Sequence, residues 1–227
     1  MTTPKRHSRH PIVTFFGLSP DVTMGELLFG LIMVLTFTLG AGIVASDDPD
    51  EARLLILAAI GCNIAWGIID AVFYVMGLLF VRGRRSRLLV EVQKADRPTA
   101  VAMIREELEE QLAPVTTEVD RAQLYERIHD ALSETPASSA AIGAADLKQA
   151  FGVFLLVSLT TIPAVFPFIF IDDPWQALRL SNGLLIALIF FVGYRWAGYT
   201  QATPWRAGLG LMLIGIVLVV IAIALGG

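Results

Sequence analysis

IAWGIIDAVFYVM, residues 64–76, is an almost wholly apolar stretch that carries one carboxylate, Asp70. With the apolar residues on either side, it is long enough to cross a bilayer, which takes about 20 residues of helix. A carboxylate near the middle of such a helix costs roughly 2.5–3.5 kcal/mol on insertion scales. A side chain that costs this much is usually paired, protonated or placed along a wet or ion-conducting path. Asp70 is therefore the first candidate for a functional residue.

The whole chain has the composition of a membrane protein. Of its 227 residues, 55% are hydrophobic and 17% are charged, whereas soluble domains are about 25% charged. Five apolar stretches can each span a bilayer, at residues 25–45, 54–81, 151–171, 180–199 and 207–225. We therefore predict an all-α, polytopic membrane fold with five transmembrane helices. Its parts are a basic tail (1–21), helices one and two (22–82), a small helical insert (83–149) and helices three to five (150–227).

The distribution of charge predicts the orientation. The first ten residues are basic and the loop at 46–51 is acidic, while residues 82–87 hold four arginines and the next loop holds Asp172 and Asp173. Because lysine and arginine favour the cytoplasmic side, we expect a cytoplasmic N-terminus and an outward C-terminus in the cell (inner) membrane. The basic start has no continuous apolar core, so we interpret it as a cytoplasmic tail and not as a signal peptide. The lipid bilayer is the expected partner, and nucleic acid is not, since no separate basic patch exists.

The insert between helices two and three is too long and too polar for a turn. Apolar residues recur at helical spacing over 98–113 and again over 118–133, which predicts two amphipathic helices. Thr117 and Asp120 resemble a capping box at the start of the second. Helix two is expected to continue to about Ala95, and residues 135–145, rich in Ala and Ser, are expected to form a linker.

Helix two places three polar residues on one face. Asn63, Asp70 and Tyr74 are separated by seven and four residues, with Gly67 between them, and this spacing aligns them on a helix. An amide, a carboxylate and a hydroxyl could coordinate a hard cation or relay protons. The alternative is a structural hydrogen-bond cluster that joins helices, with Asp70 protonated or paired.

Helix one offers two weaker candidates. Glu26 follows Thr23 at capping-box spacing, so it is either a helix cap or a carboxylate at a cytoplasmic entrance. Met33 lies on the same stripe and is either a soft thioether ligand or a packing residue. In helix three, Pro163 and Pro167 predict kinks that free backbone carbonyls. Such carbonyls would face protein or a water-filled cavity, or the bend would serve packing alone.

The insert also carries acidic residues that could sense or capture a metal. The candidates are Glu106, Glu109, Glu110, Glu126 and His129. Glu126 and His129 form one Glu-x-x-His step, which carboxylate-bridged metal bundles use on two helices. The alternative is an ordinary solvated helix face, which the nearby Arg105, Arg121 and Arg127 favour.

No constellation of residues predicts an enzyme. Aspartyl chemistry within a membrane needs two facing carboxylates, and in the sequence only Asp70 lies deep. Cys62, the single cysteine, excludes an internal disulfide and has no buried histidine to activate it. There is no phosphate-binding glycine loop, and no permanently bound cofactor is expected. The classes that remain are a membrane transporter and a non-transporting scaffold or regulatory protein that binds partners through the insert.

Several short motifs are shared with one known family. IPAVFPF at 162–168 is similar to the third-helix IPLLPY run of the vacuolar iron transporter (VIT/CCC1-like) family. ELLFGL at 26–31, IAWG at 64–67, Gly193 and the glycines from Gly208 to Gly215 resemble other parts of its pattern. Two helices, an insert of about 60 residues and three further helices reproduce its layout. The chain therefore resembles a divergent member of that family over nearly its whole length.

The resemblance implies a function and a set of positions. Members are homodimers that exchange Fe²⁺ or related divalent ions for protons, and a Glu-rich cytoplasmic domain gathers metal. Their pathway uses an Asp in helix one and a Glu and a Met in helix two, which fall here on Met33, Asn63 and Ala71. The carboxylate beside these positions is Asp70. The resemblance thus implies iron- or manganese-type exchange for protons, with the metal ion as substrate and Asp70 as coupling carboxylate. The scaffold alternative stays open.

Overall fold

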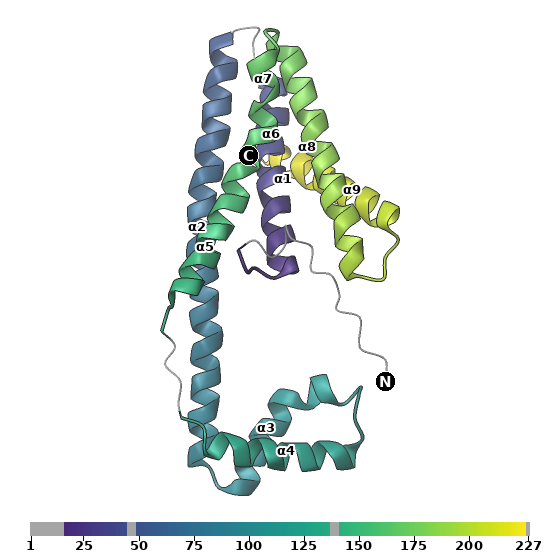
Figure 1. Ribbon diagram of the computed structural model, residues 1–227. Coiled ribbons are helices and arrows are strands. Elements are labelled where there is room, and N and C mark those ends of the chain that lie inside the picture. The colour runs from purple at the N-terminus through teal and green to yellow at the C-terminus, as the bar shows by residue number, and fades with distance from the viewer. Residues whose placement is uncertain (1–15, 45–48, 137–140, 226–227) are drawn as a thin grey trace, which may run out of the picture. The chain divides into compact units, whose positions relative to one another are not determined.

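The computed structural model describes residues 16–44, 49–136 and 141–225, and within these ranges every regular element is a helix (Figure 1). The helices are α1 (Pro20–Val44), α2 (Pro49–Lys94), α3 (Arg97–Leu112), α4 (Glu118–Ser133), α5 (Ala144–Leu159), α6 (Thr161–Val165), α7 (Pro167–Phe170), α8 (Pro174–Trp196), the 3-10 turn η1 (Ala197–Tyr199) and α9 (Pro204–Ala224). Most of the basic tail, the first half of the acidic loop at 46–51 and part of the 135–145 linker lie outside the described residues.

Among the described residues, five helical segments are long and apolar enough to cross a membrane. They are Pro20–Gly40, Ile56–Lys94, Ala144–Phe170, Pro174–Tyr199 and Pro204–Ala224. The predicted all-α fold with five spans is confirmed. The fourth span begins six residues earlier than the sequence suggested, because Asp173 caps α8 and accepts hydrogen bonds from the backbone N–H groups of Trp175 (2.9 Å) and Gln176 (3.4 Å). Pro174 fits the first turn that follows, since its missing N–H would have no partner there.

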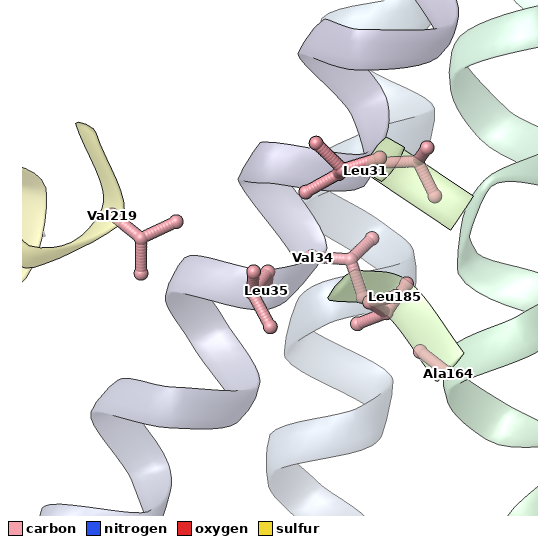
Figure 2. Packing of buried hydrophobic residues seen from close by; sticks show 7 residues of the cluster. Leu31, Val34, Leu35, Ala164, Leu185 and Val219 are labelled. Atoms are coloured by element: carbon pink, nitrogen blue, oxygen red, sulfur yellow. The ribbon is translucent and has the colours of Figure 1, made fainter. Parts of the chain in front are cut away.

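The described chain divides into two compact units. The first contains α1, α2 as far as Tyr74, and everything from Ala144 onward. In it, α8 packs most extensively against α9 and then against α1, which also contacts α5 and α9. Figure 2 shows the centre of this packing, where α1, α6, α8 and α9 bring together seven buried apolar residues. They are Leu31, Val34, Leu35, Ala164, Leu185, Ile189 and Val219.

The third span is broken twice, as its two prolines predicted. Helix α5 ends at Leu159, α6 starts at Thr161, and α7 starts at Pro167 (Figure 1). Pro163 cannot donate to the carbonyl of Leu159, nor Pro167 to that of Pro163, because proline has no N–H. At the first break the N–H of Thr160 turns instead to the carbonyl of Val157 at 3.3 Å. The break therefore alters the backbone bonding of this span at membrane depth.

The second unit, Val75–Gly143, is the end of α2 together with the α3–α4 hairpin. Its core consists of Val92, Ala100, Ile104 and Tyr125. The two predicted amphipathic helices are present, and the hydroxyl of Thr117 accepts from the backbone N–H of Asp120 at 3.3 Å, as a cap does. Helix α2 continues to Lys94, close to the predicted end.

Candidate functional site

One narrow face of α2 is turned toward the rest of the first unit. Large apolar side chains elsewhere on this helix are exposed, among them Ile68, Val72, Phe73 and Met76. Residues of the predicted polar face meet other helices, and Trp66 also packs against Phe29 of α1, with ring centroids 5.6 Å apart. Three contacts establish this: Asn63 bonds to α1 and α5, Gly67 lies against α5, and Tyr74 bonds to α5.

Asn63 is fully buried and joins three segments. Its amide Nδ2 donates to the carbonyls of Gly30 (3.2 Å) and Val157 (3.2 Å) and to the hydroxyl Oγ1 of Thr160 (2.9 Å). Thr160 stands at the break between α5 and α6. The other end of the amide, Oδ1, is buried and has no hydrogen-bond partner among the described residues. The structural-cluster interpretation thus applies to Asn63.

Two glycines permit this close meeting of helices. A Cβ atom on Gly30 would collide with Oγ1 of Thr160 and lie 3.0 Å from the carbonyl oxygen of Val157. A Cβ on Gly67 would lie 2.9 Å from the carbonyl oxygen of Phe154. Small residues at helix contacts are how membrane helices approach closely. Gly30 belongs to the ELLFGL motif and lets α1 approach the end of α5, and Gly67 belongs to the IAWG motif and lets α2 approach α5.

Asp70 and Glu26 are brought together across α1 and α2. Both are half-buried, and their carboxylates lie close enough to interact electrostatically. Oδ2 of Asp70 is buried and has no hydrogen-bond partner in the described part of the chain. Asp70 thus has a second carboxylate within electrostatic range, on α1. Sequence spacing could not show the pairing because the two residues lie on different helices.

The helix-cap alternative for Glu26 does not fit the start of α1. Helix α1 begins at Pro20, so Thr23 already lies in its first turn, where its hydroxyl donates to the carbonyl of Ser19 at 3.0 Å. Glu26 is then one turn further into the helix. Met33, seven residues beyond Glu26 on α1, is half-buried.

Tyr74 belongs to a hydrogen-bonded chain that the sequence did not reveal. Its hydroxyl donates to Oε1 of Gln149 at 3.1 Å, and Nε2 of Gln149 donates to the carbonyl of Gly17 at 3.0 Å. Gly17 has a φ of +75°, which L side chains rarely adopt. Phe16 packs so closely on α5 that a Cβ on Gly152 would lie 2.5 Å from its ring. The one signal for Gln149 was a polar side chain in the first turns of an apolar span.

The acidic residues of the insert are largely engaged in contacts between α3 and α4. Glu109 accepts from the Tyr125 hydroxyl at 2.9 Å and pairs with Arg121 at 3.1 Å. Glu126 pairs with Arg97 at 2.8 Å. Glu106 and Glu110 are exposed. Among the residues that the structure describes, no three His, Cys, Asp or Glu side chains form a group that could hold a metal ion.

Charge partners shift two pKa values in the same hairpin. The hydrogen bond with His129 (3.3 Å), followed by the bond from Arg97, holds the pKa of Asp130 below its usual value. The bonds to Glu126 and Asp130 raise the pKa of Arg97. Both shifts favour the charged forms, so these groups stabilise the hairpin as ion pairs. The arrangement fits the solvated-face alternative for Glu126 and His129.

Comparison with known proteins covers the second half of the chain better than the first. No curated protein matches it. The model of the VIT family matches residues 83–227, which contain the insert and the last three spans. The match begins after Asn63 and Asp70, so the site on α1 and the first part of α2 lies outside it. Because the match covers more than half of the residues, the chain belongs to the VIT family, a family of membrane metal transporters.

Proposed function

We propose that this protein exchanges a divalent metal cation of the iron or manganese type for protons, with Asp70 as coupling carboxylate and Glu26 as its partner. The observation that carries the proposal is a pair of half-buried carboxylates on two membrane-spanning helices, of which Oδ2 of Asp70 is buried without a hydrogen-bond partner among the described residues. Ionisable side chains within such helices mark ion pathways and proton relays as a rule. Membership of a family of membrane metal transporters supports a metal ion as the substrate.

The chemistry follows from repulsion between like charges. Two neighbouring carboxylates in a poorly solvated site do not both ionise readily, so the empty pair retains a proton. A divalent cation supplies the missing positive charge and displaces that proton, because carboxylate oxygens are ligands for hard cations. When the cation leaves on the other side of the membrane, the pair takes up a proton again. Metal movement in one direction is then coupled to proton movement in the other.

The proposal is tested by metal-driven proton flux in liposomes that contain the purified protein. We expect Asp70→Asn to abolish the flux and Glu26→Gln to reduce it, because either change removes a charge from the pair. Asp172→Asn is the matched control, since it removes an exposed carboxylate from the turn before α8 and should leave the flux unchanged. Equal flux in wild type and Asp70→Asn would refute the role of Asp70.

We further propose a homodimer in the cell membrane with its N-terminus in the cytoplasm. The dimer is implied by the family resemblance, and the orientation rests on the arginines at 82–87. Cross-linking of the protein in its membrane tests the dimer. Labelling of single cysteines placed in the 172–173 turn and in the insert tests the orientation, because only one of the two should react from outside.

A second function is favoured by one observation. The family's ligand positions hold Met33, Ala71 and Asn63 here, and the amide of Asn63 is already occupied by hydrogen bonds within the protein. A chain that has lost transport could keep the scaffold and bind partners through the α3–α4 hairpin, where Val115 and Val119 are exposed. Partner capture by the full-length protein that depends on these two valines, together with absent metal uptake, would support this function. Strong uptake that does not need the insert would oppose it.

A further inference from the structure

Asp70 lies between two hydrogen-bonded layers that tie α2 to its neighbours. Seven residues before it, the amide of Asn63 bonds to the backbone of α1 and α5, and we call this the Asn63 layer. Four residues after it, the hydroxyl of Tyr74 bonds to Gln149 of α5. At about 1.5 Å per residue, the two layers lie roughly 10 Å and roughly 6 Å along the helix from Asp70. An ion that travels along these helices to Asp70 must pass one of the layers.

The Asn63 layer is built to stay closed. Asn63 is 0% exposed, and two of its acceptors are backbone carbonyls of other helices. A Cβ atom on Gly30 would lie 3.0 Å from the carbonyl oxygen of Val157, so the helix backbones meet without spare room. Separating them would leave buried polar groups without partners, which is costly away from water.

The layer at Tyr74 can open at much lower cost. Tyr74 and Gln149 are half-buried, and Gln149 passes the connection on to the carbonyl of Gly17 through a bond of 3.0 Å at an exposed position. Water can replace hydrogen bonds at such a position, so breaking them leaves no group unpaired. We call Tyr74, Gln149 and Gly17 the Gln149 latch.

One end of the latch is fixed, and the other end is on a loosely packed helix. The φ of +75° at Gly17 turns the chain, and the ring of Phe16 lies so close to α5 that a Cβ on Gly152 would be 2.5 Å from it. Leu18, the next residue, is 4% exposed. Helix α2, in contrast, leaves large apolar side chains such as Phe73 uncovered on both sides of Tyr74. Release of the latch therefore frees α2 and leaves residues 16–18 in place.

We propose that the Gln149 latch is the gate through which cations and protons reach the Glu26–Asp70 pair. It opens at the end of the helices where α1 begins, while the Asn63 layer stays closed. This gate rests on the proposed exchange and adds its entrance. Opening moves Tyr74 away from Gln149, and water takes over their hydrogen bonds. Gln149 is a positioning residue here, because it holds α2 in place and touches neither the cation nor the transferred proton.

The test is the rate at which a cysteine at the pair reacts with a cationic, membrane-impermeant methanethiosulfonate reagent. The reference is full-length Asp70→Cys protein that also carries Cys62→Ala, purified in detergent without metal. Tyr74→Phe should accelerate the reaction about fivefold, because loss of one typical hydrogen bond shifts the balance of closed and open gate by that factor. Gln149→Leu removes two bonds and should accelerate it further. The assay needs neither metal nor the Asp70 carboxylate, so failure of the proposed exchange would not affect it.

Two control variants distinguish a gate from general loosening of the protein. Gln176→Leu removes another glutamine near the start of a span, whose Nε2 donates to Asp173 at 2.9 Å, and should leave the rate unchanged. Thr160→Val removes a partner of the Asn63 amide. In membrane vesicles with the reagent added on one side, it should not accelerate labelling from the side on which Gly17 lies, whereas Gln149→Leu should do so from that side alone.

Three results would overturn the gate. The first is an equal rate in the reference protein, Tyr74→Phe and Gln149→Leu. The second is equal acceleration by Gln149→Leu and Gln176→Leu. The third is acceleration by Gln149→Leu from the opposite side of the membrane. If Asp70→Cys does not fold, Glu26→Cys on α1 serves as the reporter, with the same order of rates expected.

Discussion

Replacing Gly67 by alanine tests the close contact between α2 and α5 beside the carboxylate pair. The added Cβ would lie 2.9 Å from the carbonyl oxygen of Phe154, 2.9 Å from Oγ of Ser158 and 3.3 Å from Cδ2 of Phe154. Ser158 can rotate, but the Phe154 carbonyl is part of the helix backbone and cannot. The two helices must therefore move apart by a few tenths of an ångström.

The size of the effect follows from two opposing contributions. Overpacking of this kind destabilises by about 1–3 kcal/mol, whereas alanine in place of glycine in a helix interior stabilises by about 0.8–1 kcal/mol. Gly61→Ala is the matched control, because it lies on the same helix and its Cβ would meet no atom within 4 Å. The propensity gain cancels between the two variants. Gly67→Ala should be the less stable by about 1–3 kcal/mol.

Thermal unfolding of the purified protein in detergent measures this difference. One kcal/mol corresponds to about 2–4 °C in Tm for a chain of this length, so the two variants should differ by about 2–12 °C. Gly67→Ala should also reduce metal-driven proton flux, because a wider gap between α2 and α5 moves Asp70. A Tm for Gly67→Ala equal to or above that of Gly61→Ala would refute the reasoning about this contact.

Three further outcomes are expected. Gly193→Ala should lower Tm relative to Gly183→Ala on the same helix, because a Cβ on Gly193 would lie 2.8 Å from the backbone of α9 whereas Gly183 faces open space; equal Tm values would contradict this. Tyr125→Phe should destabilise the insert by about 0.5–1.5 kcal/mol, because it removes the hydrogen bond to Glu109. Amide hydrogen exchange should become faster in the α3–α4 hairpin and stay unchanged in the apolar core of the first unit. Asp130 should contribute fully to the stability of the hairpin above its unfolded pKa of 3.8, and this contribution should be lost as the pH falls through its lowered folded pKa. Hydrogen exchange of the α4 amides between pH 5 and about pH 3 measures the loss. Asp130→Asn should remove this pH dependence.

The sequence predicted the helices that carry the acidic residues of the insert, but it did not predict the partners of those residues. The helices that carry Glu109 and Glu126 could be predicted, because apolar residues recur at helical spacing and Thr117 has a capping partner three residues later. Their use as partners of Arg121 and Arg97 could not be predicted, since those ion pairs depend on which faces of α3 and α4 meet. A cluster of acids in sequence is therefore compatible with either a metal site or a salt-bridged hairpin.

The sequence alone determined the properties that depend on a single segment of the chain. The number of spans follows from the length of each apolar run, because partition into lipid depends on a helix's own residues. The breaks at Pro163 and Pro167 follow from a missing N–H. The free-energy cost of placing Asp70 in a membrane helix can likewise be estimated without knowing its neighbours.

Only the tertiary structure decided which helix faces meet. It brought Glu26 within electrostatic range of Asp70, and it placed Asn63 against Thr160, 97 residues further along the chain. The rotation of a membrane helix about its axis is set by packing at small residues such as Gly30 and Gly67, and that packing depends on both partners at once. For this reason the sequence identified an expensive carboxylate, while the structure showed which helices lie around it.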